Sequence, residues 1–170
     1  DRYVNSVYYD SHDFRFYREN VQGISQRVKY RVRWYGKEYQ TMIYPIIEKK
    51  IKSNMLGAKE YISMPEDEIK LSLQNLNAIN PLRSLDLAPV TMVRYQRTYL
   101  ESFDNSIRAT IDKNLNYFPV DAGIKDINAV EDNAIILEIK YDESLSDDVD
   151  FCLQNIPFRV TKNSKYVTAF

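Results

Sequence analysis

The segment from Arg27 to Gly36, RVKYRVRWYG, alternates cationic side chains with apolar or aromatic ones at a period of two. This alternation is typical of a β-strand, because successive side chains leave opposite faces of the pleat. One face of the predicted strand carries four cations, which are Arg27, Lys29, Arg31 and Arg33. A row of like charges repels itself, so this face either lies in water, where salt screens the repulsion, or faces an anionic ligand.

The composition indicates a single domain and excludes several function classes. A chain of 170 residues is long enough for one core, and its net charge of -1 gives no overall attraction to nucleic acid or acidic membranes. One cysteine, Cys152, excludes an internal disulfide and a cysteine-based zinc site, and is typical of a reducing compartment such as the cytoplasm. No apolar run is long enough to cross a bilayer. The chain begins at Asp1 without a methionine, so we expect a fragment.

The same period-two pattern recurs along the chain. We predict further strands over residues 3–9, 46–52, 59–63, 90–103, 107–112 and 134–141. The segment 38–44 is expected to pair back on the basic strand, and a turn at Asp104 and Asn105 would place Arg97 and Arg108 in neighbouring strands.

Three helices are predicted between these strands. A short helix or turn is expected over 14–20, a longer helix opens at Pro65 and ends before Pro81, and another begins at the N-cap Ser146. The two longer helices are amphipathic and are expected to cover the apolar face of the sheet.

Charges therefore gather on one face of the predicted sheet, which is either open to water or closed into a barrel with a polar interior. Cations dominate that face: Arg31, Arg33, Lys50, Lys52, Arg97, Arg108, Lys140, Lys162 and Lys165. The carboxylates there are Glu48, Asp112 and Glu138. Asp112 is interpreted as ending its strand, and Glu138 taken alone as an ion-pair partner of Lys140. Enclosed cations in this excess would fit a chain of phosphates, and the carboxylates could hold Mg²⁺ or Mn²⁺.

Several segments, in this order and spacing, resemble the VTC domain. They are VNSVYYDSHDF, RVRWYG, IIEKKIK, VRYQRTY, IRATID, ILEIK and KNSKYV. The VTC domain is the polyphosphate-polymerase branch of the triphosphate tunnel metalloenzymes, which are related to CYTH domains. The resemblance covers residues 1–170 and implies a single α+β domain. Its fold would be a closed, eight-stranded antiparallel tunnel β-barrel flanked by helices, truncated at the N-terminus and lacking its first strand.

The resemblance also implies roles for individual residues. The implied catalytic residues are Arg31, Arg33, Lys50, Arg97 and Lys165. The implied phosphate-binding residues are the same five together with Arg108, Lys162 and Ser164, and the alternation of residues 46–52 adds Lys52 to them. Glu138 would bind the metal, Mn²⁺ or Mg²⁺, and Glu48, which the charge pattern places on the same face, would be a second ligand. The implied ligands are ATP or another triphosphate and inorganic polyphosphate, without nucleic acid, because a duplex cannot enter a tunnel.

The reaction implied by the resemblance is metal-dependent phosphoryl transfer, with polyphosphate synthesis from ATP as the favoured form. Two alternatives stay open. The barrel could bind polyphosphate or a nucleotide without turnover, or it could act as a triphosphatase, in which water accepts the phosphoryl group.

Overall fold

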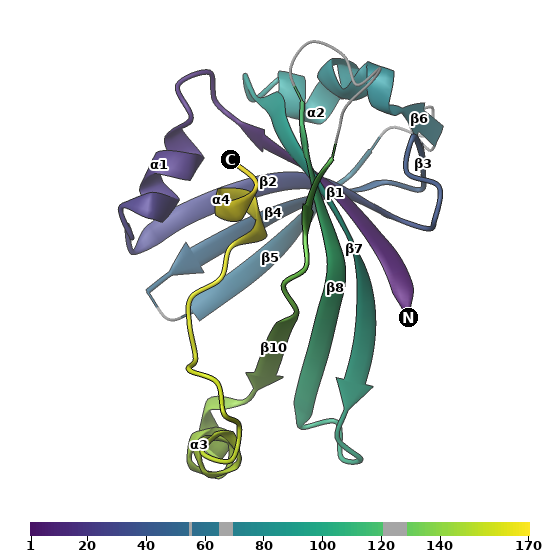
Figure 1. Ribbon diagram of the computed structural model, residues 1–170. Helices are drawn as coiled ribbons and strands as arrows, with labels where there is room; N and C mark the ends of the chain where they lie inside the picture. The colour runs from purple at the N-terminus through teal and green to yellow at the C-terminus, as the bar shows by residue number, and fades with distance from the viewer. Residues whose placement is uncertain (55, 65–69, 121–128) are drawn as a thin grey trace.

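The computed structural model describes residues 1–54, 56–64, 70–120 and 129–170. Its strands are β1 (Arg2–Asp10), β2 (Gln26–Tyr35), β3 (Thr41–Ile43), β4 (Ile46–Ser53), β5 (Leu56–Ile62), β6 (Lys70–Ser72), β7 (Ala88–Glu101), β8 (Ile107–Pro119), β9 (Val130–Asp132) and β10 (Ile136–Tyr141). Its helices are α1 (Arg15–Val21), η2 (Leu73–Ala78), α2 (Asn80–Arg83), η3 (Glu143–Leu145), α3 (Ser146–Leu153) and α4 (Lys165–Thr168) (Figure 1).

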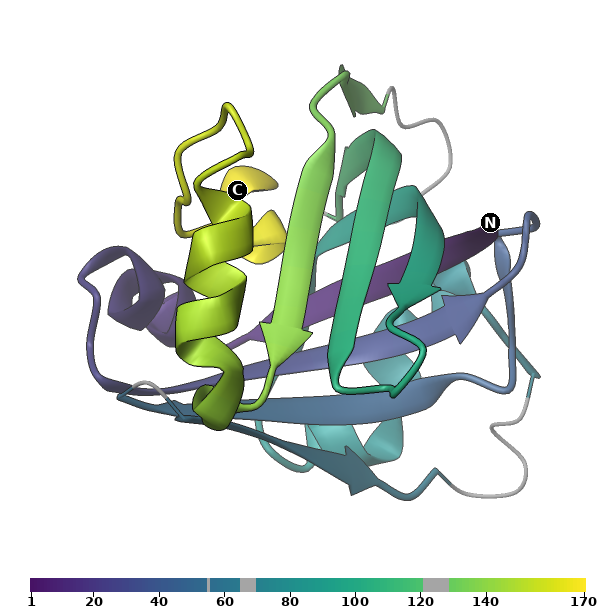
Figure 2. The same cartoon turned by 90° about the horizontal axis from the view of Figure 1, so that it is seen from below.

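An eight-stranded antiparallel sheet forms the body of the protein. Its strand order is β10-β8-β7-β1-β2-β4-β5, with β9 paired to β8, so β1 lies at the centre between β2 and β7. The sheet curls strongly, and β7, β8 and β10 stand at a steep angle to β2, β4 and β5 (Figure 2). The predicted α+β class, with an eight-stranded antiparallel sheet flanked by helices, is confirmed.

The convex face of the sheet holds the larger hydrophobic core. Alternate residues of the central strands pack there against η2, α2 and the small β3-β6 sheet. The buried members are Val7, Tyr9, Val32, Trp34, Met42, Ile47, Leu73, Leu76, Ile79, Leu82, Met92 and Phe118. Because these elements bury the apolar side of β2, the cationic side of the same strand must face the concave interior.

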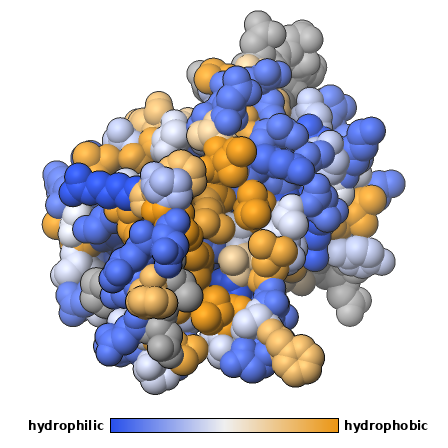
Figure 3. Space-filling model, turned by 60° about the horizontal axis from the view of Figure 1, so that its bottom comes forward, coloured by the Kyte–Doolittle hydropathy of each residue, from blue (hydrophilic) through white to orange (hydrophobic). Residues whose placement is uncertain are grey.

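The concave face carries a second, more aromatic cluster. It consists of Val4, Tyr8, Val93, Tyr95, Leu115, Tyr117 and Tyr166. Tyr166 belongs to α4, and its ring stacks on Tyr8 with the ring centroids 5.1 Å apart. Seen from below, the molecule is hollowed, with hydrophobic side chains in the hollow and hydrophilic ones around it (Figure 3).

The helix predicted over residues 65–79 is wrong for residues 70–79, the part of that range that the structure describes. Residues 65–69 lie outside the described residues, 70–72 form β6, and Leu73–Ala78 is a 3₁₀ helix. The segment 38–44 supplies β3, which pairs with β6 and not with β2 as predicted. The apolar residues Leu73, Leu76, Ile79 and Leu82 recur every third position, which suits the three-residue turn of a 3₁₀ helix better than an α-helix.

Two further predictions need correction. Strand β8 does not end at Asp112 but continues to Pro119, because Arg97 and Lys165 neutralise the buried carboxylate. The helix predicted from Ser146 exists as α3, yet it lies beside β10 and does not cover the apolar face, which η2 and α2 already occupy (Figure 2). In the part of the chain that the structure describes, no helix has the length and apolar character needed to traverse a bilayer.

Candidate functional site

Two buried arginines lie side by side at the centre of the concave face. Arg31 and Arg33 are only 6% and 7% exposed, and both extend from β2. Arg31 donates to the carboxylate of Glu48, its register partner on β4. Arg33 donates from Nε to the Ser6 hydroxyl and from Nη2 to the Tyr95 hydroxyl, both at 3.2 Å. The burial of two neighbouring guanidinium groups is costly unless anions compensate them.

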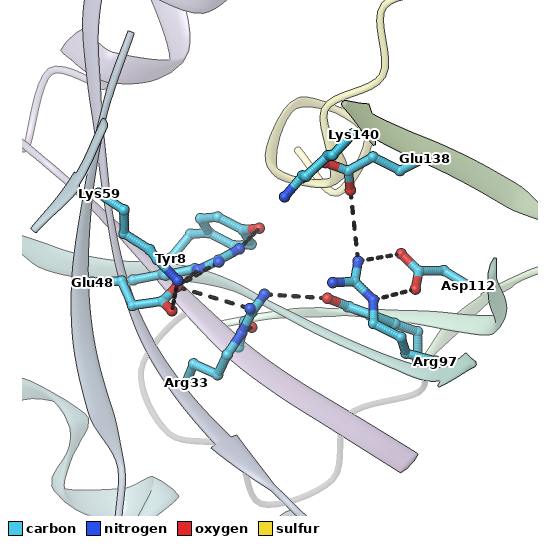
Figure 4. A network of polar contacts seen from close by, with 11 residues as sticks. Tyr8, Arg33, Glu48, Lys59, Arg97, Asp112, Glu138 and Lys140 are labelled. Carbon is cyan, nitrogen blue, oxygen red and sulfur yellow. Dashed lines mark hydrogen bonds and ion pairs between the residues drawn. The ribbon is translucent and has the colours of Figure 1, made fainter. Parts of the chain in front are cut away.

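One carboxylate serves three cations in this cluster. Glu48 pairs with Arg31, lies 3.2 Å from the Lys59 amine and lies 3.9 Å from Nη1 of Arg33 (Figure 4). Burial acts to raise the pKa of Glu48, but Arg31 and Arg33 outweigh it and lower the pKa to about 2. Glu48 is therefore ionised at neutral pH, and the cluster around it keeps a surplus of positive charge.

A second cluster is built on β7, β8 and β10. Arg97 grips the buried Asp112 with two hydrogen bonds of 2.6 and 2.7 Å, and Lys165 reaches the same carboxylate at 2.6 Å. Glu138 lies 3.8 Å from Arg97 and 3.4 Å from Lys140. Figure 4 shows this cluster facing the Arg33–Glu48 cluster. Tyr95 lies between them, since its hydroxyl accepts from Arg33 and the centroid of its ring lies 5.2 Å from the Arg97 guanidinium.

The C-terminal helix α4 is held in place by a buried aspartate. Asp10 accepts hydrogen bonds from the backbone N–H groups of Phe16 and Tyr17 at 2.9 Å, and from the Tyr166 hydroxyl at 2.5 Å. Ser164 caps α4 and accepts a 2.8 Å hydrogen bond from Lys29. These contacts bring the C-terminal residues onto the concave face and set Lys165 against Asp112.

Lys50 faces the two clusters from β4. Repulsion by Arg31 is the largest influence on it, and together with burial and the further cations Arg33 and Lys140 it lowers the pKa of Lys50 to about 7. Lys50 is exposed, so the repulsion, which does not require burial, is the main cause of the lowered pKa. The positive potential of the concave face therefore disfavours the charged form of Lys50.

The structure brings most of the predicted site residues together. Those that share the concave clusters are Arg31, Arg33, Glu48, Lys50, Arg97, Glu138, Ser164 and Lys165. Lys52 lies towards one end of the sheet, beside a pocket between α1 and the ends of β2 and β4. Arg108 lies at the β7–β8 hairpin, where its side chain is 71% exposed and pairs with Glu101. Lys162 is exposed and makes no ion pair with any described residue.

Other residues of the site escaped the sequence-based assignment. They are Ser6, Tyr8, Asp10, Lys29, Lys59, Tyr95 and Tyr166. Lys29 follows the same alternation as Arg31, so the period of two already placed it on the cationic face of the strand. Lys59 lies on the inward face of β5, where its amine pairs with Glu48. Nothing in the local sequence marks Asp10, whose partners Tyr17 and Tyr166 are brought to it only by folding.

The family model for the VTC domain matches residues 1–170, the whole chain. The chain belongs to the VTC domain family. No curated protein matches it. Among solved structures, this VTC domain is similar in fold to the crystal structure of a "putative adenylate cyclase" from Bacillus halodurans. The TM-score is 0.54 and the identity 13%, with 99% of this chain and 82% of the other covered.

Proteins of this family generally depend on a divalent metal, and the carboxylates of this VTC domain differ in how well they fit one. Among the described residues, no three His, Cys, Asp or Glu side chains gather in a metal-binding group. Glu48 and Asp112 are buried and each faces several cations. Glu138 differs, because its side chain is 42% exposed. Burial opposes its ionisation, yet Lys140, Lys50 and Arg97 hold the pKa of Glu138 below its usual value. One ionised carboxylate fits an Mg²⁺ or Mn²⁺ ion whose other ligands are phosphate oxygens and water.

Proposed function

We propose that this protein binds a nucleoside triphosphate by its phosphates on the concave face and transfers a phosphoryl group, with inorganic polyphosphate synthesis from ATP as the favoured reaction. The observation that carries the proposal is the pair of buried arginines, Arg31 and Arg33, which share the single carboxylate of Glu48. A chain of phosphates supplies the missing negative charge, and its oxygens match the planar guanidinium fork.

In this proposal, catalysis consists of positioning and charge stabilisation. Phosphoryl transfer needs in-line alignment and neutralisation of the equatorial oxygens, more than covalent help from the protein. Arg33 and Arg97 would hold phosphate oxygens from opposite sides of the Tyr95 hydroxyl. Burial raises the pKa of Tyr95 to about 12 despite the opposing effect of Arg33 and Arg97, so the phenol stays neutral and can donate its proton in a hydrogen bond. No enzyme nucleophile is needed when the acceptor is another phosphate.

The metal, in this proposal, is held by Glu138 together with the phosphates. A divalent cation held there would supply positive charge that neutralises the phosphates. Glu48, the second predicted ligand, serves better as the counter-ion of Arg31, because it is only 2% exposed and is paired with that guanidinium, whereas the Glu138 side chain is 42% exposed.

Incubation with ATP and Mn²⁺, followed by gel separation of long phosphate chains, tests this proposal. We expect chains from the wild-type protein and none from Glu138→Gln. Glu138→Gln should still bind tripolyphosphate without metal, as measured by calorimetry, because the cations remain. Glu131→Gln, an exposed carboxylate change on β9, is the matched control and should keep full activity. Chain synthesis that persists in Glu138→Gln with unchanged Mn²⁺ dependence would remove the metal role of Glu138.

A second candidate is a module that binds polyphosphate or nucleotide without turnover. The observation that favours it is the occupation of Glu48 and Asp112 by cations, which leaves Glu138 as the most accessible carboxylate of the described concave clusters. The same assay separates the candidates. Tight binding with no product indicates a module, and release of inorganic phosphate without chains indicates a triphosphatase.

The contribution of Lys50 to tripolyphosphate affinity is expected to fall as the pH rises from about 6.5 to 8.5, because Lys50 has a pKa of about 7 in the free protein. Bound phosphate favours the charged amine and raises that pKa. Above pH 7, binding is therefore accompanied by the uptake of a proton by Lys50. A step that takes up a proton becomes less favourable as the pH rises. Calorimetry in buffers of different ionisation enthalpy measures the uptake directly.

Lys50→Met is the matched variant for this pH dependence. It should bind tripolyphosphate more weakly and show less proton uptake between pH 7 and 8.5, while the titration of the phosphate itself stays the same. Lys49→Met changes the neighbouring residue on the opposite face, where Lys49 pairs with Glu60, and should behave as wild type. An unchanged proton uptake in Lys50→Met would show that another group titrates.

A further inference from the structure

One end of the concave face carries aromatic rings and guanidinium groups in alternation. The Arg2 guanidinium lies 3.4 Å from the centroid of the Tyr35 ring and 5.9 Å from that of Tyr99. Arg97 in turn lies 5.8 Å from the Tyr99 centroid and 5.2 Å from that of Tyr95. The order Tyr35, Arg2, Tyr99, Arg97, Tyr95 is therefore a ladder that begins at the surface and ends in the phosphate-binding clusters. We call it the aromatic ladder.

Strand register explains why these residues meet. Arg2 of β1 is the partner of Arg97 on β7, and Val4 of β1 is the partner of both Tyr35 on β2 and Tyr95 on β7. Tyr99 is two residues beyond Arg97 and therefore on the same face. The ladder thus lies at one mouth of the concave face, directly next to the arginine that holds Asp112.

Exposure changes along the aromatic ladder in a way that suits a ligand with one charged and one flat end. Tyr95 is 2% exposed, whereas Tyr99 is 52% exposed and Arg2 lies open to solvent. Among the described residues, no carboxylate pairs with Arg2, since Asp1 is engaged by Lys113 and Thr98. The outer members of the aromatic ladder, Tyr99 and Arg2, therefore present a ring and a planar cation to solvent.

The opposite end of the concave face is different in character. There the inward residues of β2 and β4 are Arg27, Lys29 and Lys52, and Ser164 accepts from Lys29. Burial together with Arg27 and Arg31 lowers the pKa of Lys29 to about 8. This end is suited to a chain of phosphates, whereas the aromatic ladder is suited to a flat group of little charge.

We propose that the aromatic ladder is the nucleobase subsite of the donor, in which the base of the nucleoside triphosphate stacks on Tyr99 and Arg2 while Arg97 and Arg33 hold its phosphates. The inference rests on the proposed function and adds an orientation to it: base at the ladder, phosphates towards Arg31 and Lys29. Stacking on a ring or a guanidinium accepts any base, because every base presents a π-face. The subsite is therefore expected to accept ATP and GTP within a few-fold of each other.

A purely structural role for the ladder is the competing explanation, since cation–π pairs stabilise strands without any ligand. The two explanations differ in what the loss of Tyr99 does to different ligands. Loss of a stacking contact with the base lowers the affinity for nucleotides only. Weakened packing at the sheet end lowers the affinity for nucleotide and inorganic tripolyphosphate alike.

The experiment compares the affinities of ATP and inorganic tripolyphosphate for wild type, Tyr99→Leu and Tyr99→Phe by calorimetry at fixed salt. We expect Tyr99→Leu to lose about tenfold in ATP affinity, within the range contributed by base–aromatic stacking. Its tripolyphosphate affinity should stay within about twofold, because the arginines are untouched. Tyr99→Phe keeps the ring and should keep the ATP affinity. Tyr3→Leu is the matched control, because Tyr3 pairs with Arg94 through a cation–π contact across the same two strands on the opposite face.

Each possible outcome either supports or overturns the base subsite. An unchanged ratio of ATP to tripolyphosphate affinity in folded Tyr99→Leu overturns the base subsite while leaving the phosphate site standing. A wild-type protein that binds tripolyphosphate but not ATP overturns it as well. Failure of the wild type to bind either ligand overturns the proposed function and with it this inference. If Tyr99→Leu fails to fold, the same comparison on Arg2→Gln decides, with the same selective loss expected.

Discussion

Arg33→Ala is expected to weaken tripolyphosphate binding by about 100-fold or more, the largest loss of ligand affinity from any single change considered. Removal of a buried, charge-assisted partner typically costs 2–5 kcal/mol of binding free energy, and tenfold in affinity corresponds to about 1.4 kcal/mol. Arg33 is chosen over Arg31 because its protein contacts are neutral hydroxyls, Ser6 and Tyr95, while Glu48 is 3.9 Å away. Its removal therefore leaves the tight Arg31–Glu48 ion pair in place.

The fold is expected to tolerate this change. Loss of Arg33 relieves repulsion with Arg31, which offsets part of the loss of two hydrogen bonds from a charged group, each worth about 1.5–3 kcal/mol. Calorimetric titration measures the affinity, and thermal unfolding measures the stability. Arg94→Ala is the control, because Arg94 extends from β7 to the opposite face and donates to the Lys37 carbonyl. Wild-type affinity in a folded Arg33→Ala protein would place the phosphate site elsewhere.

Much of the fold was predictable because the sheet depends on alternation. The period of two in β1, β2, β4, β7 and β10 reads directly from the sequence, and it assigns Arg31, Arg33, Lys50, Arg97 and Glu138 to one face without any structure. The basic strand alone could not decide whether that face lies in water. That decision depends on the apolar side of the sheet, which η2 and α2 bury.

The errors arise where folding overrides local pattern. Asp112 follows a short apolar alternation and looks like the end of a strand, yet Arg97 and Lys165 neutralise it and the strand continues. The residues before Ile79 contain helix-forming and apolar positions, but β3 pairs with residues 70–72 and the apolar spacing of three selects a 3₁₀ helix.

The parts of the site that were missed are joined across long sequence separations. Asp10 meets Tyr166 only because α1 and α4 lie together at one end of the sheet. Lys29 meets Ser164 for the same reason. Neither pair is marked by a local sequence pattern. The sequence therefore predicts which face of each strand a residue occupies, but not where the C-terminal segment packs against the sheet.

Glu48→Gln is expected to lower the free energy of unfolding by about 3 kcal/mol or more at pH 7, the usual cost of removing one partner from a buried ion pair. The physical reason is that Arg31 and Arg33, 6% and 7% exposed, lose the carboxylate that compensates both. Urea unfolding measures the change. Glu60→Gln is the control, since Glu60 pairs with Lys49 on the exposed face of the same two strands and should cost less than about 1 kcal/mol.

The loss in Glu48→Gln should depend on pH with a definite sign. In the folded protein the pKa of Glu48 is about 2, below the model-compound value of 4.5. The unfolded chain therefore takes up a proton between pH 4.5 and 2 that the folded chain does not. The stabilisation by Glu48 is complete above pH 4.5 and disappears as the pH falls towards 2. The difference in stability between wild type and Glu48→Gln should shrink over the same interval.

Tripolyphosphate should restore much of what Glu48→Gln loses, because the ligand supplies anionic oxygens to the same two arginines. A ligand that binds only the folded state raises stability with its concentration relative to its dissociation constant. Removal of a competing carboxylate should tighten binding, so at equal ligand concentration the melting temperature should rise further in Glu48→Gln than in wild type. Equal shifts in the two proteins would contradict the idea that Glu48 and the phosphates compete for Arg31 and Arg33. A larger shift would place the ligand at these arginines by a measurement of stability alone, independent of any assay for product.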